Sequence, residues 1–165
     1  MNESSATAQS NPTRHTVITG ASGAIGSALA KHYAKPGVKL WLQGRNVTAL
    51  EAVAQACQAN GAQTELVVLD TSDLASVTAW GQRLAELGER GGLAENSVGI
   101  DLLVVNAGMN IHINTDTQLE DPQQSQQLLQ INLMSSIALV QAVVPSMQAR
   151  GRGQIALVSS LAAWR

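Results

Sequence analysis

Short runs of aliphatic and β-branched residues alternate along the chain with longer stretches in which apolar residues recur at helical spacing. The short runs predict five strands, at residues 15–19, 38–43, 64–70, 100–106 and 154–159. The longer stretches predict four helices, at residues 25–35, 47–60, about 73–89 and about 122–149. Three of the strand runs lack strict alternation, as parallel strands buried on both faces do.

A strict succession of strand and helix predicts the α/β class, with a doubly wound parallel sheet. The crossovers are expected to be right-handed and to place helices on both faces of the sheet. In the longest helix, the apolar stripe that is expected to face the core consists of Leu129, Leu133, Ile137, Val140, Val144 and Met147. Ligands bind such sheets at the carboxyl ends of the strands, so the residues that end strands are the candidates for function.

The 165 residues suit one domain, which we expect to span residues 14–165 behind a polar, disordered lead at residues 1–13. A net charge of −2 gives no electrostatic footprint for nucleic acid or an anionic membrane. Residues 131–144 are too short and too polar to span a bilayer, and the N-terminus lacks a secretory signal. We therefore expect a cytoplasmic protein. With Cys57 as the only cysteine and three scattered histidines, no disulfide and no metal site is expected.

A glycine-rich turn joins the first predicted strand to the first helix, with the sequence Thr-Gly-Ala-Ser-Gly-Ala-Ile-Gly at residues 19–26. Glycines in this context permit a tight turn, a close approach of the backbone to a pyrophosphate, and close packing of helix on strand. The helix N-terminus adds N–H donors and the positive end of a dipole. The candidate nucleotide-binding residues here are Gly20, Ser22, Gly23, Ala24, Ile25 and Gly26.

From residue 14 onward the sequence resembles the short-chain dehydrogenase/reductase family. The landmarks that carry the resemblance follow the glycine turn in order: Asp70, Asn106-Ala107-Gly108, Asn132 and Ser159-Ser160. The resemblance implies a Rossmann-type sheet that is incomplete relative to the family. The glycine spacing 20, 23 and 26 instead matches the extended branch, which includes sugar-nucleotide epimerases and dehydratases. The Asn-Ala-Gly and Ser-Ser landmarks favour the short form.

The end of the second strand carries Arg45 and Asn46 and no carboxylate that could accept bonds from a ribose 2′-hydroxyl. Arg45 stands where similar reductases hold the 2′-phosphate of the cofactor. The sequence therefore favours NADP(H) over NAD(H). The resemblance also implies that Asp70 accepts a hydrogen bond from the adenine amino group, and that Asn106, Ala107 and Gly108 lie against the cofactor ribose.

The family's reaction is hydride transfer between the nicotinamide and a small carbonyl or alcohol substrate. By resemblance, Ser160 holds the substrate oxygen and Asn132 is the helix asparagine of the catalytic tetrad. The family's Tyr-x-x-x-Lys is not found: the single tyrosine, Tyr33, lies on the first predicted helix. We therefore expect an N-terminal part of an oxidoreductase, truncated before the Tyr and inactive alone, whose full-length form is a homo-oligomer. The alternatives are a non-catalytic dinucleotide-binding module and an extended-branch epimerase or dehydratase.

Overall fold

The computed structural model describes residues 13–89, 99–111 and 119–160, so nearly all of the predicted lead lies outside the described residues. The five strands are β1 (Arg14–Ile18), β2 (Val38–Gly44), β3 (Gln63–Val68), β4 (Ile100–Val105) and β5 (Gln154–Leu157). The helices are α1 (Ala24–Tyr33), α2 (Val47–Ala59), α3 (Leu74–Glu89), α4 (Pro122–Leu129), the π-helix η1 (Gln130–Met134) and α5 (Ser135–Ala149).

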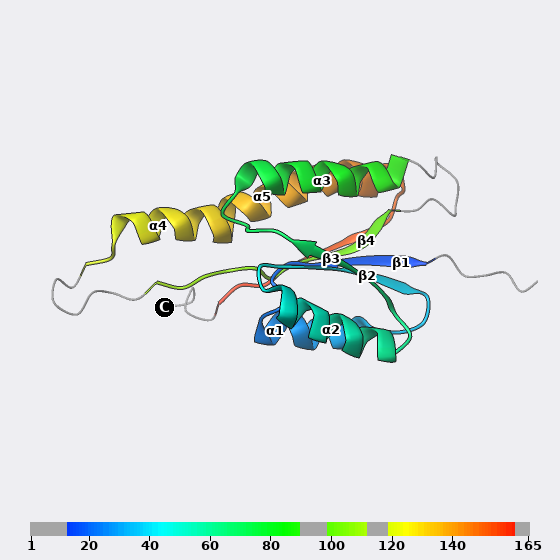
Figure 1. The fold of residues 1–165 in the computed structure, drawn as a ribbon. Coiled ribbons are helices and arrows are strands. Elements are labelled where there is room, and N and C mark those ends of the chain that lie inside the picture. The colour runs from blue at the N-terminus through cyan, green and yellow to red at the C-terminus, as the bar shows by residue number, and fades with distance from the viewer. Residues whose placement is uncertain (1–12, 90–98, 112–118, 161–165) are drawn as a thin grey trace, which may run out of the picture.

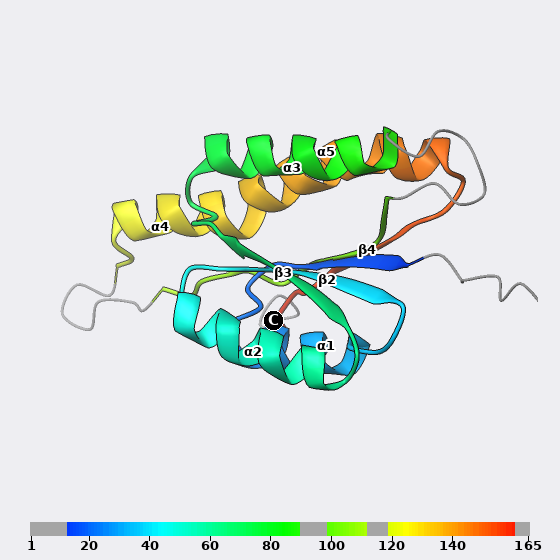
Figure 2. The same ribbon diagram turned by 45° about the vertical axis from the view of Figure 1, so that its right-hand side comes forward.

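All five strands form one parallel sheet in the order β3-β2-β1-β4-β5. Helices α1 and α2 cover one face, and α3 and α5 cover the other (Figures 1 and 2). The doubly wound α/β prediction is therefore confirmed. The chain runs outward from β1 to β3 and then crosses back to β4, so the strand order reverses between β1 and β4. A crevice opens at such a reversal, at the carboxyl ends of the strands.

Two aliphatic clusters fill the space between the sheet and its helices, one on each face. The central strands β1, β2 and β4 are largely buried, as the lack of alternation predicts. The edge strands differ. Most residues of β3 and all residues of β5 are exposed, and these two strands form the edges of the sheet. Burial on both faces, predicted for three of the five strands, therefore holds for the three strands at the centre of the sheet.

The predicted core stripe of the longest helix is wrong in register. The buried residues are instead Ile131, Ser135, Leu139, Val143 and Met147, and of the predicted stripe only Met147 is buried. The π-helical turn of η1 alters the helical phase between α4 and α5. Ser135 can be buried because its hydroxyl donates to the Ile131 carbonyl, 2.6 Å away. Leu133 and Ile137 are left 50% and 39% exposed.

Helices α4, η1 and α5 form one continuous stretch of 28 residues. This stretch is long and apolar enough to cross a membrane, which corrects the estimate made from residues 131–144 alone. The core helix of a soluble protein passes the same test. In this fold α5 packs against α3 and β4, with Leu139 and Val143 buried between the layers. The cytoplasmic location stays a prediction.

Candidate functional site

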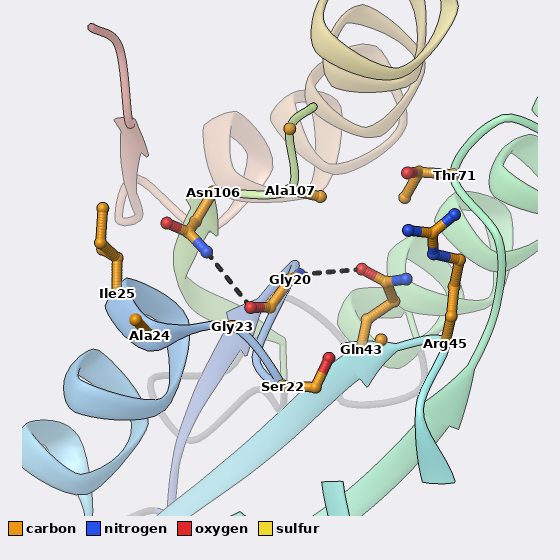
Figure 3. A pocket seen from close by; sticks show the side chains of 12 residues that line it. Gly20, Ser22, Gly23, Ala24, Ile25, Gln43, Arg45, Thr71, Asn106 and Ala107 are labelled. Carbon is orange, nitrogen blue, oxygen red and sulfur yellow. Dashed lines mark hydrogen bonds between the residues drawn. The ribbon is translucent and has the colours of Figure 1, made fainter. Parts of the chain in front are cut away.

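A cavity of about 360 Å³ opens at the carboxyl ends of β1, β2 and β4, where the strand order reverses. Its lining includes most of the predicted cofactor-binding residues: Gly20, Ser22, Gly23, Ala24, Ile25, Arg45, Asn106, Ala107 and Gly108 (Figure 3). Gln43, Gly44 and Thr71 also line it and were not singled out from the sequence. Gly26, Asn46 and Asp70 lie just outside the lining. The structure thus brings residues from four segments of the chain around one cavity.

The glycine turn is shaped by close backbone contacts. Gly20 has φ +65°, and a Cβ there would come within 3.0 Å of the Ala107 Cα. A Cβ on Gly26 would collide with the backbone of Gly20, with its carbonyl carbon only 2.8 Å away. The turn then enters α1 at Gly23, an N-cap that offers no side-chain hydrogen bond. The first N–H groups of α1 therefore have no intrahelical or capping partner and can bind an anion.

A set of hydrogen bonds joins the end of β1 to the end of β4. The Thr19 hydroxyl accepts the N–H groups of Asn106 and Ala107, both at 2.9 Å. In return, the Asn106 amide donates to the Thr19 carbonyl at 3.0 Å. It also donates to the Gly20 carbonyl at 3.3 Å, a bond that Figure 3 shows. Thr19 itself is 1% exposed. These bonds fix the two strand ends that form the floor of the cavity.

The end of β2 supplies a cation and no acid. A Cβ on Gly44 would lie 2.7 Å from the Ser22 hydroxyl, so a side chain at this position is excluded unless Ser22 moves. Arg45 follows, and it is the one charged residue among those described as lining the cavity. Asn46 is the N-cap of α2 and accepts the Ala49 N–H at 3.0 Å. The role of Asn46 in the fold is therefore to cap the N-terminus of α2.

Asp70 lies two residues beyond the end of β3, next to Arg45. The two side chains form an exposed ion pair at 3.7 Å. The Ser72 N–H donates to the Asp70 carboxylate at 2.9 Å, and it is the main reason that the pKa of Asp70 is lowered, with Arg45 adding a smaller effect. Asp70 is therefore ionised at neutral pH and pairs with Arg45.

A second cavity, of about 660 Å³, adjoins the first and shares Asn106, Ala107 and Gly108 with it. Ser160 and Asn132, the two predicted catalytic residues, both line this second cavity. Ser160 lies three residues beyond β5, and Asn132 lies in η1. Much of the remaining wall is apolar and comes from η1, α5 and the end of β5: Leu133, Ile137, Val140, Leu157 and Val158. The two predicted groups of residues therefore line two cavities that share part of their wall.

The side chain of Asn132 holds the loop that follows β4 through two hydrogen bonds to Met109. Its Oδ1 accepts the Met109 N–H at 2.8 Å, and its Nδ2 donates to the Met109 carbonyl at 2.9 Å. Its Oδ1 also lies 3.3 Å from where a Cβ on Gly108 would be, which explains the glycine there. The π-turn that presents Asn132 was not predicted, because its sequence shows the same apolar spacing as an α-helix.

Tyr33 is far from both cavities. It lines a separate hollow at the amino ends of the strands, beside Lys35 and Arg14. Its ring stacks edge-on against His32, with the ring centres 5.2 Å apart. Because parallel strands begin at one edge of the sheet and end at the other, Tyr33 cannot serve as a proton donor for a substrate at Ser160.

Comparison with known proteins identifies relatives of this arrangement. The model of the short-chain dehydrogenase family matches residues 14–165. An uncharacterised oxidoreductase of Myxococcus xanthus is 32% identical over 152 residues, which cover 92% of this chain and 56% of the relative. Dehydrogenase/reductase SDR family member 7 from Homo sapiens is 34% identical over 150 residues, covering 87% of this chain and 40% of the relative. The chain thus spans about half the length of these relatives.

Solved structures of similar fold include enzymes crystallised with NADP or NADPH. A metagenomic short-chain oxidoreductase in complex with NADP superimposes with a TM-score of 0.76 at 31% identity, over 92% of this chain and 64% of that one. L-sorbose reductase from Gluconobacter frateurii, complexed with NADPH and L-sorbose, superimposes with a TM-score of 0.75 at 27% identity, over 93% and 54% of the two chains.

Proposed function

Since this chain belongs to the short-chain dehydrogenase family, we propose that it forms the cofactor-binding part of an NADP(H)-dependent reductase or dehydrogenase. The observation that carries the proposal is the strand-end cavity, which combines a glycine turn, an uncapped helix N-terminus and one arginine. The small residues leave the space that a dinucleotide needs. Side chains at Gly20 or Gly44 would fill that space or push the pocket wall apart. When bound, the nicotinamide cofactor supplies or accepts the hydride.

Each part of the cavity has a proposed role. The first turn of α1 offers N–H donors and a positive dipole end to the pyrophosphate. Arg45 holds the 2′-phosphate with charge-assisted hydrogen bonds, and Asp70 accepts from the adenine amino group. Asn106, Ala107 and Gly108 border the ribose between the two cavities. In the second cavity, Ser160 orients the oxygen of a small carbonyl or alcohol, and Asn132 holds the loop after β4 in place.

Replacing Arg45 with Gln is expected to lower the affinity for NADPH about tenfold and to change that for NADH little. The loss of one charge-assisted contact to phosphate accounts for an effect of this size. Dissociation constants from titration calorimetry measure it, with Arg83→Gln on α3 as the matched control outside the cavity. If Arg45→Gln leaves the ratio of the two dissociation constants unchanged, the proposed role of Arg45 is wrong.

The 165-residue chain is expected to bind NADPH without turning over a carbonyl substrate. The second cavity has its serine, but the single tyrosine of the chain lies at the other edge of the sheet, so no tyrosine is placed to donate a proton. NADPH oxidation with a panel of ketones and aldehydes tests this, with Ser160→Ala as the control. Turnover that Ser160→Ala abolishes would contradict the expectation.

The same observation favours one second candidate, a dinucleotide-binding module without catalysis. The two candidates share the same fold and differ in what the gene encodes after Arg165. An in-frame Tyr-x-x-x-Lys downstream of Arg165 would support the reductase, and a stop codon there would support the module. The extended-branch alternative gains no support from the relatives above, which are short-chain enzymes.

A further inference from the structure

The side chain of Gln43, at the end of β2, is a buried amide that connects two segments of the cofactor cavity. It is 2% exposed although it lines that cavity. Its Oε1 accepts the Gly20 N–H at 3.1 Å, a bond that Figure 3 shows. Its Nε2 donates to the Leu69 carbonyl at 2.6 Å, just beyond the end of β3. One side chain thus ties the glycine turn to the segment that carries Asp70.

The backbone around Gln43 strengthens the same connection. The Gln43 carbonyl accepts the Ala21 N–H at 2.8 Å, so side chain and main chain of one residue hold two successive amides of the turn. The Gly44 carbonyl accepts the Leu69 N–H at 3.1 Å. The end of β2 is therefore the point from which both neighbouring segments are held.

Gly20 is consequently fixed from both sides. Gln43 holds its N–H, while its carbonyl accepts the Asn106 amide at 3.3 Å and the Gly23 N–H at 3.0 Å. Fixing both peptide units matters because glycine, which here has φ +65°, has more accessible backbone conformations than any other residue. The Gly20 N–H is also removed from the donors that the turn can offer to an anion.

A purely packing role does not explain a glutamine at this place. Burying a primary amide is unfavourable unless its donor and acceptor are paired, whereas an aliphatic side chain at a buried strand end has no such cost. At Gln43 both groups are paired, and both partners are backbone groups of segments that border the cavity. The two hydrogen bonds, rather than the volume, therefore distinguish glutamine from leucine or methionine here.

We propose that Gln43 is a positioning residue for the cofactor, which holds the glycine turn and the segment after β3 in the geometry that binds the dinucleotide. The inference rests on the proposed function and extends it to a residue outside the resemblance to the family. Gln43 acts through the backbone groups of Gly20 and Leu69 that its amide holds.

The first test replaces Gln43 with Met, which keeps most of the volume and removes both hydrogen bonds. We expect the dissociation constant for NADP⁺ to rise at least tenfold, measured well below the melting temperature of every variant. Val77→Ala is the control, because Val77 is fully buried in the cluster between the sheet and α3. It lowers the melting temperature without touching the cavity, so its dissociation constant should equal that of the wild type.

The second test uses Gln43→Glu, because pH controls whether the side chain of this variant can donate a hydrogen bond. A carboxylate can accept the Gly20 N–H but has no proton for the Leu69 carbonyl, whereas the protonated acid satisfies both. Burial raises the pKa of a carboxyl group. Relative to the wild type at the same pH, the affinity of Gln43→Glu for NADP⁺ should therefore improve severalfold between pH 8 and pH 5.5. Dividing the affinity of the variant by that of the wild type cancels the effect of protonating the cofactor's own phosphate, which is the same for both proteins.

The outcomes separate the two proposals. If the wild-type chain binds no NADP⁺, the proposed function is wrong. If it binds and Gln43→Met binds equally well, or if Val77→Ala loses as much affinity, the role of Gln43 is overturned. Should Gln43→Met fail to fold, the pH response of Gln43→Glu decides alone, and an affinity ratio that is flat with pH overturns the role.

Discussion

Replacing Gly26 with Ala is expected to abolish NADPH binding and to lower the free energy of unfolding by about 3 kcal/mol, the upper range for forcing atoms into a packed site. The added methyl would collide with the Gly20 carbonyl group and approach the Ala21 Cα to 2.9 Å. These are backbone atoms, so α1 must move away from the turn. Alanine favours a helix by about 1 kcal/mol over glycine, which is too little to offset the collision.

Gly23→Ala is the matched control in the same turn. Gly23 has φ −81°, which any residue adopts, and a Cβ there would meet only the Gly20 oxygen at 3.3 Å. We expect Gly23→Ala to lower the free energy of unfolding by less than about 1 kcal/mol, the usual size of an N-cap effect. Chemical denaturation and titration with NADPH measure both variants. An equal loss of unfolding free energy in Gly26→Ala and Gly23→Ala would contradict the account of the turn.

Thr19→Val is expected to destabilise the protein by about 3 kcal/mol and to weaken NADPH binding. Valine keeps the shape but removes the oxygen that accepts the N–H groups of Asn106 and Ala107. Two partly buried donors then lose their partner, at about 1–3 kcal/mol each when fully buried. The effect reaches the cofactor site because Ala107 lines both cavities.

Thr78→Val is the control for this change. Thr78 is exposed on α3, and its hydroxyl donates to the Leu74 carbonyl within the same helix. Valine and threonine have similar helix propensities, so we expect a change within about 0.5 kcal/mol. Denaturation curves of the two variants give the comparison, and a Thr19→Val protein as stable as Thr78→Val would refute the proposed joint between β1 and β4.

The fold could be predicted because strand and helix spacing alternate clearly and a parallel sheet has few topologies. The same patterns could not predict the register of the longest helix. Apolar residues occur on both of its sides, and Ser135 made the buried side look polar. Only the structure shows that the Ser135 hydroxyl is satisfied within its own helix and that a π-turn alters the phase. The exposure of the edge strands depends on the order of the strands in the sheet, which cannot be read from the sequence.

The cavity residues were predictable where a local motif names them, as for Gly20 and the Asn-Ala-Gly run. The lining residues Gln43, Gly44 and Thr71 were missed, as was Thr19, which joins β1 to β4, because their roles depend on contacts with segments distant in sequence. Each adjoins a strand end that had been singled out, so a search of all residues next to those ends would have included them. The distance between Arg45 and Asp70 likewise emerges only when β2 and β3 lie side by side.

An NMR titration of the 15N-labelled 165-residue chain with NADPH tests the central claim most directly, because the glycine amides report on separate parts of the molecule. The cavity at the carboxyl ends contains Gly20, Gly23, Gly44 and Gly108, whereas Gly37, Gly61 and Gly153 lie elsewhere. We predict saturable shifts at the first four and none at the last three, with weaker binding of NADH at the same sites. Saturating NADPH that leaves the first four unmoved, or that shifts Gly37 and Gly153 at the opposite edge instead, would contradict the account.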